Sequence, residues 1–265
     1  MSSLKWPPIV AEAAEVVDSY AGTGVTLRQL FYRLVAAEIL PNTTNAYKHL
    51  SKCTAEARRA GTFPALIDRG RDIHRHAHWD SPEDARESLR RQYRRDRTEG
   101  QEYSVYVGVE KSGMIVQLRS WFGDLGVPIL ALGGYSSQTY ADDVREDADD
   151  QERPAVLLYA GDFDPSGEDI PRDFCERADC FDEVRRVALS AAQVQHYGLP
   201  PLPGKSTDSR AAGFVAKHGS LMQVELDALP PDTLHGLYQD ALDEFWDVSA
   251  YVASMDREAA ERAEL

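Results

Sequence analysis

Three acidic residues follow two predicted strands and have the right chemistry for a divalent cation. Glu110 follows a predicted strand over residues 103–109, and Asp162 and Asp164 follow another over residues 155–160. In open parallel sheets, ligands bind beyond the carboxyl ends of the strands. Carboxylates on adjacent loops repel each other, and a hard cation with oxygen ligands removes that repulsion. We therefore predict a Mg²⁺ site, with Mn²⁺ as the alternative ion, and a catalytic role for Glu110. The competing interpretation is turn and helix-capping chemistry, because Asp164 precedes a predicted helix.

A second candidate is the pair of Arg28 and Tyr32. Thr26 and Gln29 have the spacing of a capping box, which predicts a helix beginning there. On that helix Arg28 lies one turn before Tyr32 on the same face, where it can hold a phosphate or a phenolate. Phe31 already supplies the apolar position, so Tyr32 points about 100° away from it. Tyr32 is thus either a nucleophile or DNA contact, or a core aromatic residue.

Basic residues in the first part of the chain predict contact with DNA. Asn42 is expected to cap a helix over residues 43–60, whose exposed side carries Lys48, Lys52, Arg58 and Arg59. Lys111, next to Glu110, is either a phosphate contact or a surface lysine. The arginine-rich segment 81–98 is either a solvated connector or a further phosphate contact.

Weaker candidates have ordinary explanations that we favour. His74, His76 and His78 alternate and are expected on a wing or linker surface rather than at a metal. Lys205, Asp208 and Arg210 are expected in a polar turn rather than a phosphate-binding loop. Glu225 and Asp227 alternate with apolar residues, which predicts the solvent face of a strand rather than additional metal ligands.

The elements that position these residues fall into two patterns. Helices expected over residues 8–21, 26–41 and 43–60 precede an extended segment over residues 62–79, the order of a winged helix-turn-helix. Strands expected near residues 103–109, 128–132, 155–160 and 184–189 alternate with helices, which predicts a parallel α/β sheet. We assign residues 1–80 to a DNA-binding domain, residues 81–100 to a charged linker helix, and residues 101–265 to a metal-binding α/β domain with a helical C-terminal extension.

Composition narrows the class of protein. The chain has 265 residues, is 43% hydrophobic and carries a formal net charge of −15. The charge is uneven: residues 1–100 hold 16 Lys and Arg against 13 Asp and Glu, and the remainder holds 13 against 31. A basic first part joined to an acidic second part fits a DNA-contacting module next to a metal site. The three cysteines fit neither a disulfide framework nor a zinc site. With no apolar run of membrane length or secretion signal, we expect a cytoplasmic, nucleoid-associated protein and no membrane partner.

The carboxylate pattern resembles a known family. A Glu after one strand and Asp-x-Asp-x-x-Gly after a later one, here Glu110 and residues 162–167, resembles the TOPRIM domain of topoisomerases, primases and related nucleases. The Glu110-Lys111 pair followed by Asp-x-Asp-Pro-x-Gly resembles more narrowly the A subunit of topoisomerase VI and the meiotic double-strand-break transesterase. In that family a winged helix carries Arg-acidic-x-aromatic-Tyr, and residues 28–32 are similar, with Gln29 in the acidic place. The resemblance covers roughly residues 20–190.

This resemblance implies a fold, partners and an activity. The fold is an N-terminal winged helix followed by a TOPRIM-type parallel-sheet domain. The site would form in a homodimer, with Tyr32 of one subunit facing the metal site of the other, and strand passage would require an ATPase partner chain. We expect Mg²⁺-dependent DNA cleavage of a stand-alone nuclease type. The alternatives are tyrosine transesterification of the topoisomerase kind and a non-catalytic DNA-binding regulator.

Overall fold

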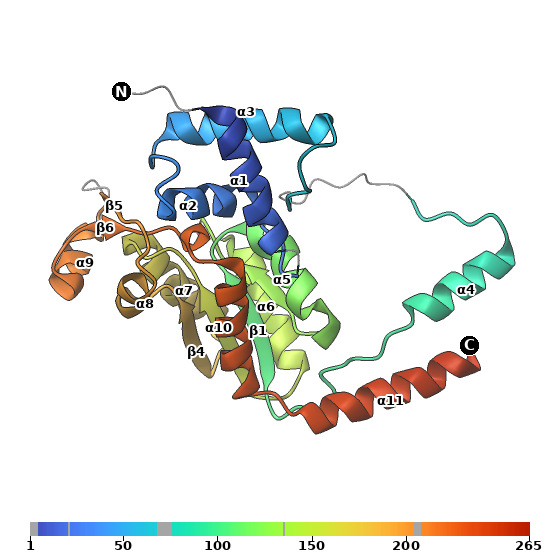
Figure 1. Ribbon diagram of the computed structural model, residues 1–265. Coiled ribbons are helices and arrows are strands. Elements are labelled where there is room, and N and C mark those ends of the chain that lie inside the picture. The colour runs from blue at the N-terminus through green and yellow to red at the C-terminus, as the bar shows by residue number, and fades with distance from the viewer. Residues whose placement is uncertain (1–4, 21, 68–75, 135, 204–207) are drawn as a thin grey trace.

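The N-terminal helices form one group in the computed structural model, which describes residues 5–20, 22–67, 76–134, 136–203 and 208–265. Helices α1 (Trp6–Ser19), α2 (Leu27–Ala36) and α3 (Thr44–Arg59) pack against one another (Figure 1). The predicted capping box begins α2, where Thr26 and Gln29 bond each other's backbone amides. Helix α3 is capped by Thr43 rather than by Asn42, because the Thr43 hydroxyl accepts the hydrogen bond from the Ala46 amide.

A four-stranded parallel sheet forms the centre of the molecule, as the alternating pattern predicts. Its order is β2-β1-β3-β4, with β1 at Ser104–Val109, β2 at Ile129–Ala131, β3 at Ala155–Ala160 and β4 at Glu183–Ala188. Strands β1 and β3 pair along their whole length and end together at Val109 and Ala160. The loops that carry Glu110 and Asp162 therefore start side by side at the same edge.

The two faces of the sheet have separate cores because successive side chains of a strand point to opposite faces. On one face the strands pack with α5 (Ile115–Phe122), α10 (Pro231–Asp243) and the N-terminal helices in one continuous hydrophobic cluster. On the other face α6 (Gln138–Asp150) and α7 (Pro165–Ala178) cover Tyr106, Leu157 and Tyr159. The N-terminal helices thus share a core with the sheet, which holds α2 next to the ends of the strands.

Two charged helices project away from the sheet (Figure 1). They are α4 (Pro82–Gln92), in the predicted connector, and the last helix, α11 (Val248–Glu264). The segment between α4 and β1 is fastened to α11 by Arg97, which donates to both carboxylate oxygens of the buried Glu258. The connector and the C-terminal helix therefore form one arm.

Short elements complete the chain. These are η1 (Ser112–Met114), η2 (Gly123–Leu125), α8 (Ala191–His196), β5 (Leu202–Pro203), α9 (Ala211–His218), β6 (Met222–Gln223) and η3 (Leu226–Ala228). Strands β5 and β6 pair antiparallel. In the predicted wing, Ile67 forms an isolated bridge with Thr26, and residues 68–75 lie outside the described residues. No helix in the described part of the chain is both long and apolar enough to cross a membrane.

Candidate functional site

Glu110 and Asp162 meet where β1 and β3 end. The Glu110 carboxylate accepts a hydrogen bond from the Asp162 amide at 2.8 Å, and the Glu110 amide donates to the Ala160 carbonyl. Burial and the nearby charge of Asp162 raise the pKa of Glu110 to about 7. Burial likewise raises the pKa of Asp162, although Lys111 opposes the shift. Two carboxyl groups are thus held together where their charged forms are disfavoured.

Asp164, the third predicted ligand, has a capping role in the structure. Its carboxylate accepts a 2.7 Å hydrogen bond from the Gly167 amide and begins α7. Across the described ranges, no three His, Cys, Asp or Glu side chains are grouped closely enough to hold a metal ion. The structure therefore brings Glu110 and Asp162 together and leaves Asp164 at the start of the next helix.

Lys111 lies among carboxylates rather than on the open surface. Its ammonium group is 2.9 Å from Asp162 and 3.4 Å from Asp227, and it forms a third ion pair with Glu225. Burial opposes the charged form of Lys111, but these acids outweigh it and raise the pKa. A lysine surrounded in this way stays protonated at neutral pH and neutralises part of the acidic cluster.

Arg28 connects α2 to the same cluster. Its guanidinium pairs with Glu225 and lies 3.4 Å from Asp227, and its side chain is 32% exposed. Arg33, from the same helix, donates to the carbonyl of Ala228. Two arginines of α2 therefore hold the 225–228 segment, which places that segment between the N-terminal helices and the sheet.

Tyr32 is buried beside Arg28. The Arg28 guanidinium carbon is 6.0 Å from the centre of the Tyr32 ring, and Phe31 packs edge-on against that ring. Burial and the charge of Glu225 raise the pKa of Tyr32, and Arg28 and Lys111 reduce this shift. Its phenolate is therefore rarer at neutral pH than that of a free tyrosine.

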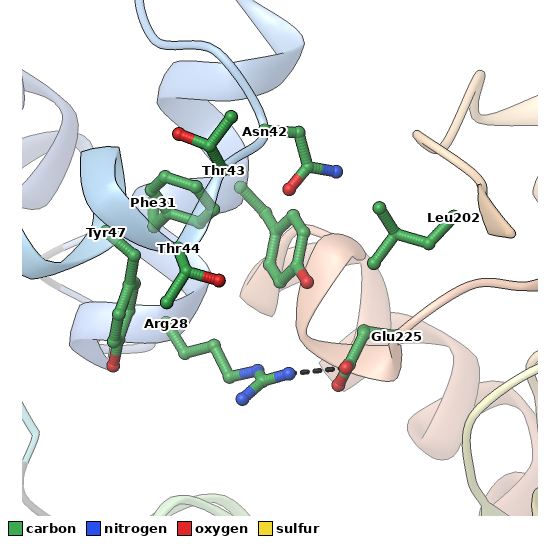
Figure 2. Close-up of a pocket in the computed structure, with 9 residues that line it drawn as sticks. Arg28, Phe31, Asn42, Thr43, Thr44, Tyr47, Leu202 and Glu225 are labelled. Atoms are coloured by element: carbon green, nitrogen blue, oxygen red, sulfur yellow. Dashed lines mark ion pairs between the residues drawn. The ribbon is translucent and has the colours of Figure 1, made fainter. Parts of the chain in front are cut away.

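Two cavities meet at Arg28. The first, of about 310 Å³, is lined by Arg28, Phe31, Tyr32, Asn42, Thr43, Thr44, Tyr47, Leu202 and Glu225. Figure 2 shows Arg28 extending toward Glu225 at the lower side of this cavity, with Asn42 and Leu202 above it. The second, of about 540 Å³, is lined by Arg28, Glu110, Lys111, Ser112, Gly113, Ala131, Gly133 and Gly134. Arg28 is common to the aromatic cavity and the acidic one.

Two glycines allow the backbone to approach the acids closely. A Cβ atom on Gly133 would clash with the carbonyl oxygen of Glu110, and one on Gly167 would clash with that of Asp162. Only glycine fits such a contact without displacement. The backbone at these two glycines therefore packs directly against the carbonyls of Glu110 and Asp162, and the Asp162 carbonyl also accepts a hydrogen bond from Arg186.

The prediction that Glu225 and Asp227 lie on the solvent face of a strand is wrong. They do not lie on the solvent face of a strand, because the chain leaves β6 at Gln223 and turns through η3. The Glu225 and Asp227 side chains are only 11% and 3% exposed, and both pair with Arg28 and Lys111. Their alternation with apolar residues does signal burial on one side, but the sequence gives no indication of cationic partners so far along the chain.

The other candidates are dispersed. Lys48, Lys52, Arg58 and Arg59 are exposed on α3, as predicted. His76 and His78 are exposed, and His74 lies outside the described residues. Asp208 and Arg210 bond each other and Ser166 near the start of α7, while Lys205 lies outside the described residues.

No protein-family model matches the chain, and no curated protein matches it.

Proposed function

We propose that this protein cleaves DNA in a reaction that depends on Mg²⁺, as a winged-helix and TOPRIM-type protein similar to the A subunit of topoisomerase VI. The observation that supports this most is that Arg28, Lys111 and Glu110 line one cavity at the ends of β1 and β3, with Asp162 bonded to Glu110 and Tyr32 beside Arg28. Basic, acidic and phenolic groups at one edge of a parallel sheet suit phosphoryl transfer.

The donor set fits a hard cation in part. Glu110 and Asp162 have carboxylates whose charged forms are destabilised by burial, and a divalent ion would remove that penalty. In each of Glu110, Asp162 and Asp164, one carboxylate oxygen accepts a backbone hydrogen bond. We assign the other oxygens of Glu110 and Asp162 to Mg²⁺ or Mn²⁺, and Asp164, which caps α7, would have to move closer to join them as the third ligand. The bound ion would supply positive charge to the scissile phosphate.

The protein's own residues bind and orient the phosphate. Arg28 and Lys111 are charged at neutral pH and line the cavity beside Glu110, so both are suited to bind phosphate oxygens. Glu225 pairs with both cations and holds them in place until DNA enters. Lys48, Lys52, Arg58 and Arg59 on α3 would bind the DNA backbone further away.

Between the two cleavage chemistries, the surroundings of Tyr32 favour hydrolysis. Attack by Tyr32 requires loss of the phenolic proton, and burial together with Glu225 raises the pKa of that group. We therefore assign the attack to water and give Tyr32 a role in contacting DNA. Transesterification by Tyr32 is the second candidate, supported by the guanidinium of Arg28 beside the ring.

The assignment of partners follows from the resemblance and from the packing. DNA is the substrate, and a homodimer is expected, while an ATPase partner chain would be needed only for strand passage. Arg28 already contacts Glu225 of its own chain, so this arrangement favours a site built within one subunit rather than across two.

The test is incubation with supercoiled plasmid and Mg²⁺ or Mn²⁺, with and without EDTA. We expect relaxed and linear products only with metal, no protein attached to DNA ends after denaturation, and no cutting by Glu110→Ala. The matched control is Glu102→Ala, because Glu102 is exposed two residues before β1. Tyr32→Phe should cut at a reduced rate.

Three results would change the assignment. Loss of cutting in Tyr32→Phe together with covalent adducts in the wild type would establish transesterification. Intact plasmid in all reactions, with DNA binding retained, would instead support the non-catalytic regulator. Cutting by Glu110→Ala at the wild-type rate would contradict the proposed acidic site.

A further inference from the structure

The aromatic cavity beside Tyr32 has more recognition chemistry than phosphate cleavage requires. We infer that it binds a single unpaired base of the DNA, adjacent to the phosphate held at Arg28, so that the preferred substrate contains unpaired nucleotides. This inference rests on the proposed function, and it names the class of DNA that the same site accepts.

The walls of the cavity suit the faces of a base. Phe31 lines the cavity, and the rings of Tyr32 and Tyr47 each pack edge-on against it at a centroid distance of 5.4 Å. Of the three rings, Phe31 and Tyr32 are buried, and Tyr47 is only partly buried. Aromatic side chains bind unpaired bases by stacking and do so with little dependence on sequence. Tyr47 is therefore the ring best able to accept a base.

Polar groups around the same space suit the edge of a base. The Asn42 side chain, which offers both a donor and an acceptor, lines the cavity near Thr43 and Thr44 (Figure 2). Within the described residues the Asn42 amide forms no side-chain hydrogen bond, so it is available to a ligand. Paired donors and acceptors of this kind recognise base edges.

The shape of the cavity requires the base to leave its stack. Its walls come from α2, from the start of α3 and, through Leu202, from β5, so the space is bounded on several sides. Its volume of about 310 Å³ is at the lower end of small-molecule pockets. A base inside a duplex cannot reach such a space without unpairing, which costs least where it is already unpaired.

Arg28 provides the link from this cavity to the acidic site. It lines both spaces, so a phosphate bound to its guanidinium would have its base on the Tyr47 side and the scissile bond on the Glu110 side. The exposed Lys48 and Lys52 continue along α3 from the same cavity and can bind the flanking backbone.

The inference is tested by binding in EDTA, where cleavage plays no part. The probes are two oligonucleotides of the same sequence, one fully paired and one with 2-aminopurine as a single-nucleotide bulge. We expect the wild type to bind the bulged probe about tenfold more tightly and to quench its fluorescence by stacking. Equal affinities, or unchanged fluorescence on binding, would overturn the inference.

Variants of the cavity give the decisive comparison. Tyr47→Leu should lose the preference for the bulge while keeping its affinity for the paired probe, which also shows that it is folded. Tyr47→Phe keeps the ring and should retain the preference. The control Lys52→Ala, on the exposed side of α3, should weaken both probes equally. An unchanged preference in Tyr47→Leu would overturn the assignment of the cavity.

A free nucleotide has the same base chemistry, so deoxyadenosine monophosphate serves as the competitor. Displacement of the bulged probe only at concentrations about a hundredfold above the probe's own Kd supports a site for DNA, because the oligonucleotide adds backbone contacts. Displacement at concentrations close to that Kd would overturn the inference and indicate a site for free nucleotides. If plasmid cleavage fails while the preference for the bulge persists, the proposed function falls and the cavity assignment stands.

Discussion

The negative charge of Glu225 lies between the N-terminal helices and the sheet. Its effect on the pKa of Tyr32 can be measured. Its carboxylate is one of the causes that raise the pKa of Tyr32, and burial is the largest. Glu225→Gln removes that charge while Arg28 and Lys111 stay positive, so the pKa of Tyr32 should fall. Nuclear magnetic resonance titration of labelled tyrosine, with the signal assigned through Tyr32→Phe, measures the change.

The control for this titration is Glu146→Gln. Glu146 is exposed on α6, which covers the opposite face of the sheet from α2. The same change of charge there should leave the pKa of Tyr32 where it was. A Tyr32 signal that titrates identically in Glu225→Gln and in the wild type would show that the two groups are not coupled.

Glu110 should make metal binding depend on pH. Its pKa of about 7 lies above the ordinary value of 4.5, so a proton competes with any cation bound at this carboxylate up to neutral pH. Affinity for Mg²⁺ should fall about tenfold for each pH unit below 7, with release of a proton on binding. Isothermal titration at pH 6 and pH 8, in buffers of different ionisation enthalpy, measures both.

The stability of the metal-free protein should depend on pH in the same pH range. A raised pKa means that the folded state binds the Glu110 proton more tightly than the unfolded chain does. The contribution of Glu110 to stability is therefore lost as the pH rises from about 4.5 to about 7. Glu110→Gln cannot ionise, so it should abolish this loss and reduce the pH dependence of Mg²⁺ binding, leaving only the part that Asp162 causes. Mg²⁺ affinity in the wild type that is the same at pH 6 and pH 8 would contradict the assignment.

Among the elements, the arm of α4 and α11 depends on one buried ion pair. The Arg97 and Glu258 side chains are 7% and 1% exposed, and they bond at two positions. Glu258→Gln removes the charge that Arg97 contacts at two positions and leaves Arg97 only its 3.6 Å pair with Asp124, so it should lower the free energy of unfolding by about 3 kcal/mol. Urea denaturation measures the loss, and Glu264→Gln, exposed on the same helix, is the control.

The same pair sets the response of the arm to acid. The hydrogen bond from Arg97 lowers the pKa of Glu258 to about 2, from an ordinary value of 4.5. The unfolded chain takes up a proton first, so the stabilisation is complete above pH 4.5 and is lost as the pH falls toward 2. Stability of Glu258→Gln that falls over this range as steeply as that of the wild type would contradict the assignment.

The elements were predictable where local chemistry decides them. The capping box at Thr26 and the runs that became β1 and β3 were identified because propensity and hydrophobic pattern agree there. The cap of α3 was predicted one residue early, since Asn42 and Thr43 both have capping side chains. Glu225 and Asp227 were misassigned because their burial depends on Arg28 and Lys111, and Lys111 is 114 residues before Glu225. Alternation alone cannot reveal such partners.

At the scale of the whole molecule, the net charge of −15 requires DNA to bind through a local basic surface. Variants that reverse the charges of Lys48, Lys52, Arg58 and Arg59 should bind DNA less tightly. The magnitude of the slope of log K against log salt should fall by about one unit per lost phosphate contact. Fluorescence anisotropy in EDTA measures both. The comparison variant reverses the charges of four arginines in the connector, Arg86, Arg90, Arg91 and Arg94. This change should leave the slope unchanged.

The opposite outcome would place the DNA on another surface of the protein. If the connector variant loses the salt dependence and the α3 variant keeps it, the DNA lies along the arm. The exposure of the α3 residues was predictable from helical spacing, whereas the position of α3 against α1 and α2 was not. That position follows from the shared core beneath α1, α2 and α3, which depends on packing between distant segments.

The contacts of Gly133 and Gly167 mean that this site can be damaged without touching a single reactive group. An added methyl at either position acts as a wedge, pushing the Glu110 or the Asp162 carbonyl away from its present place. Selections for inactive variants should therefore yield substitutions at Gly133 and Gly167, which carry no reactive group, as readily as at Glu110 and Asp162. Such variants would keep every charge of the wild type, and their defect would be one of alignment alone.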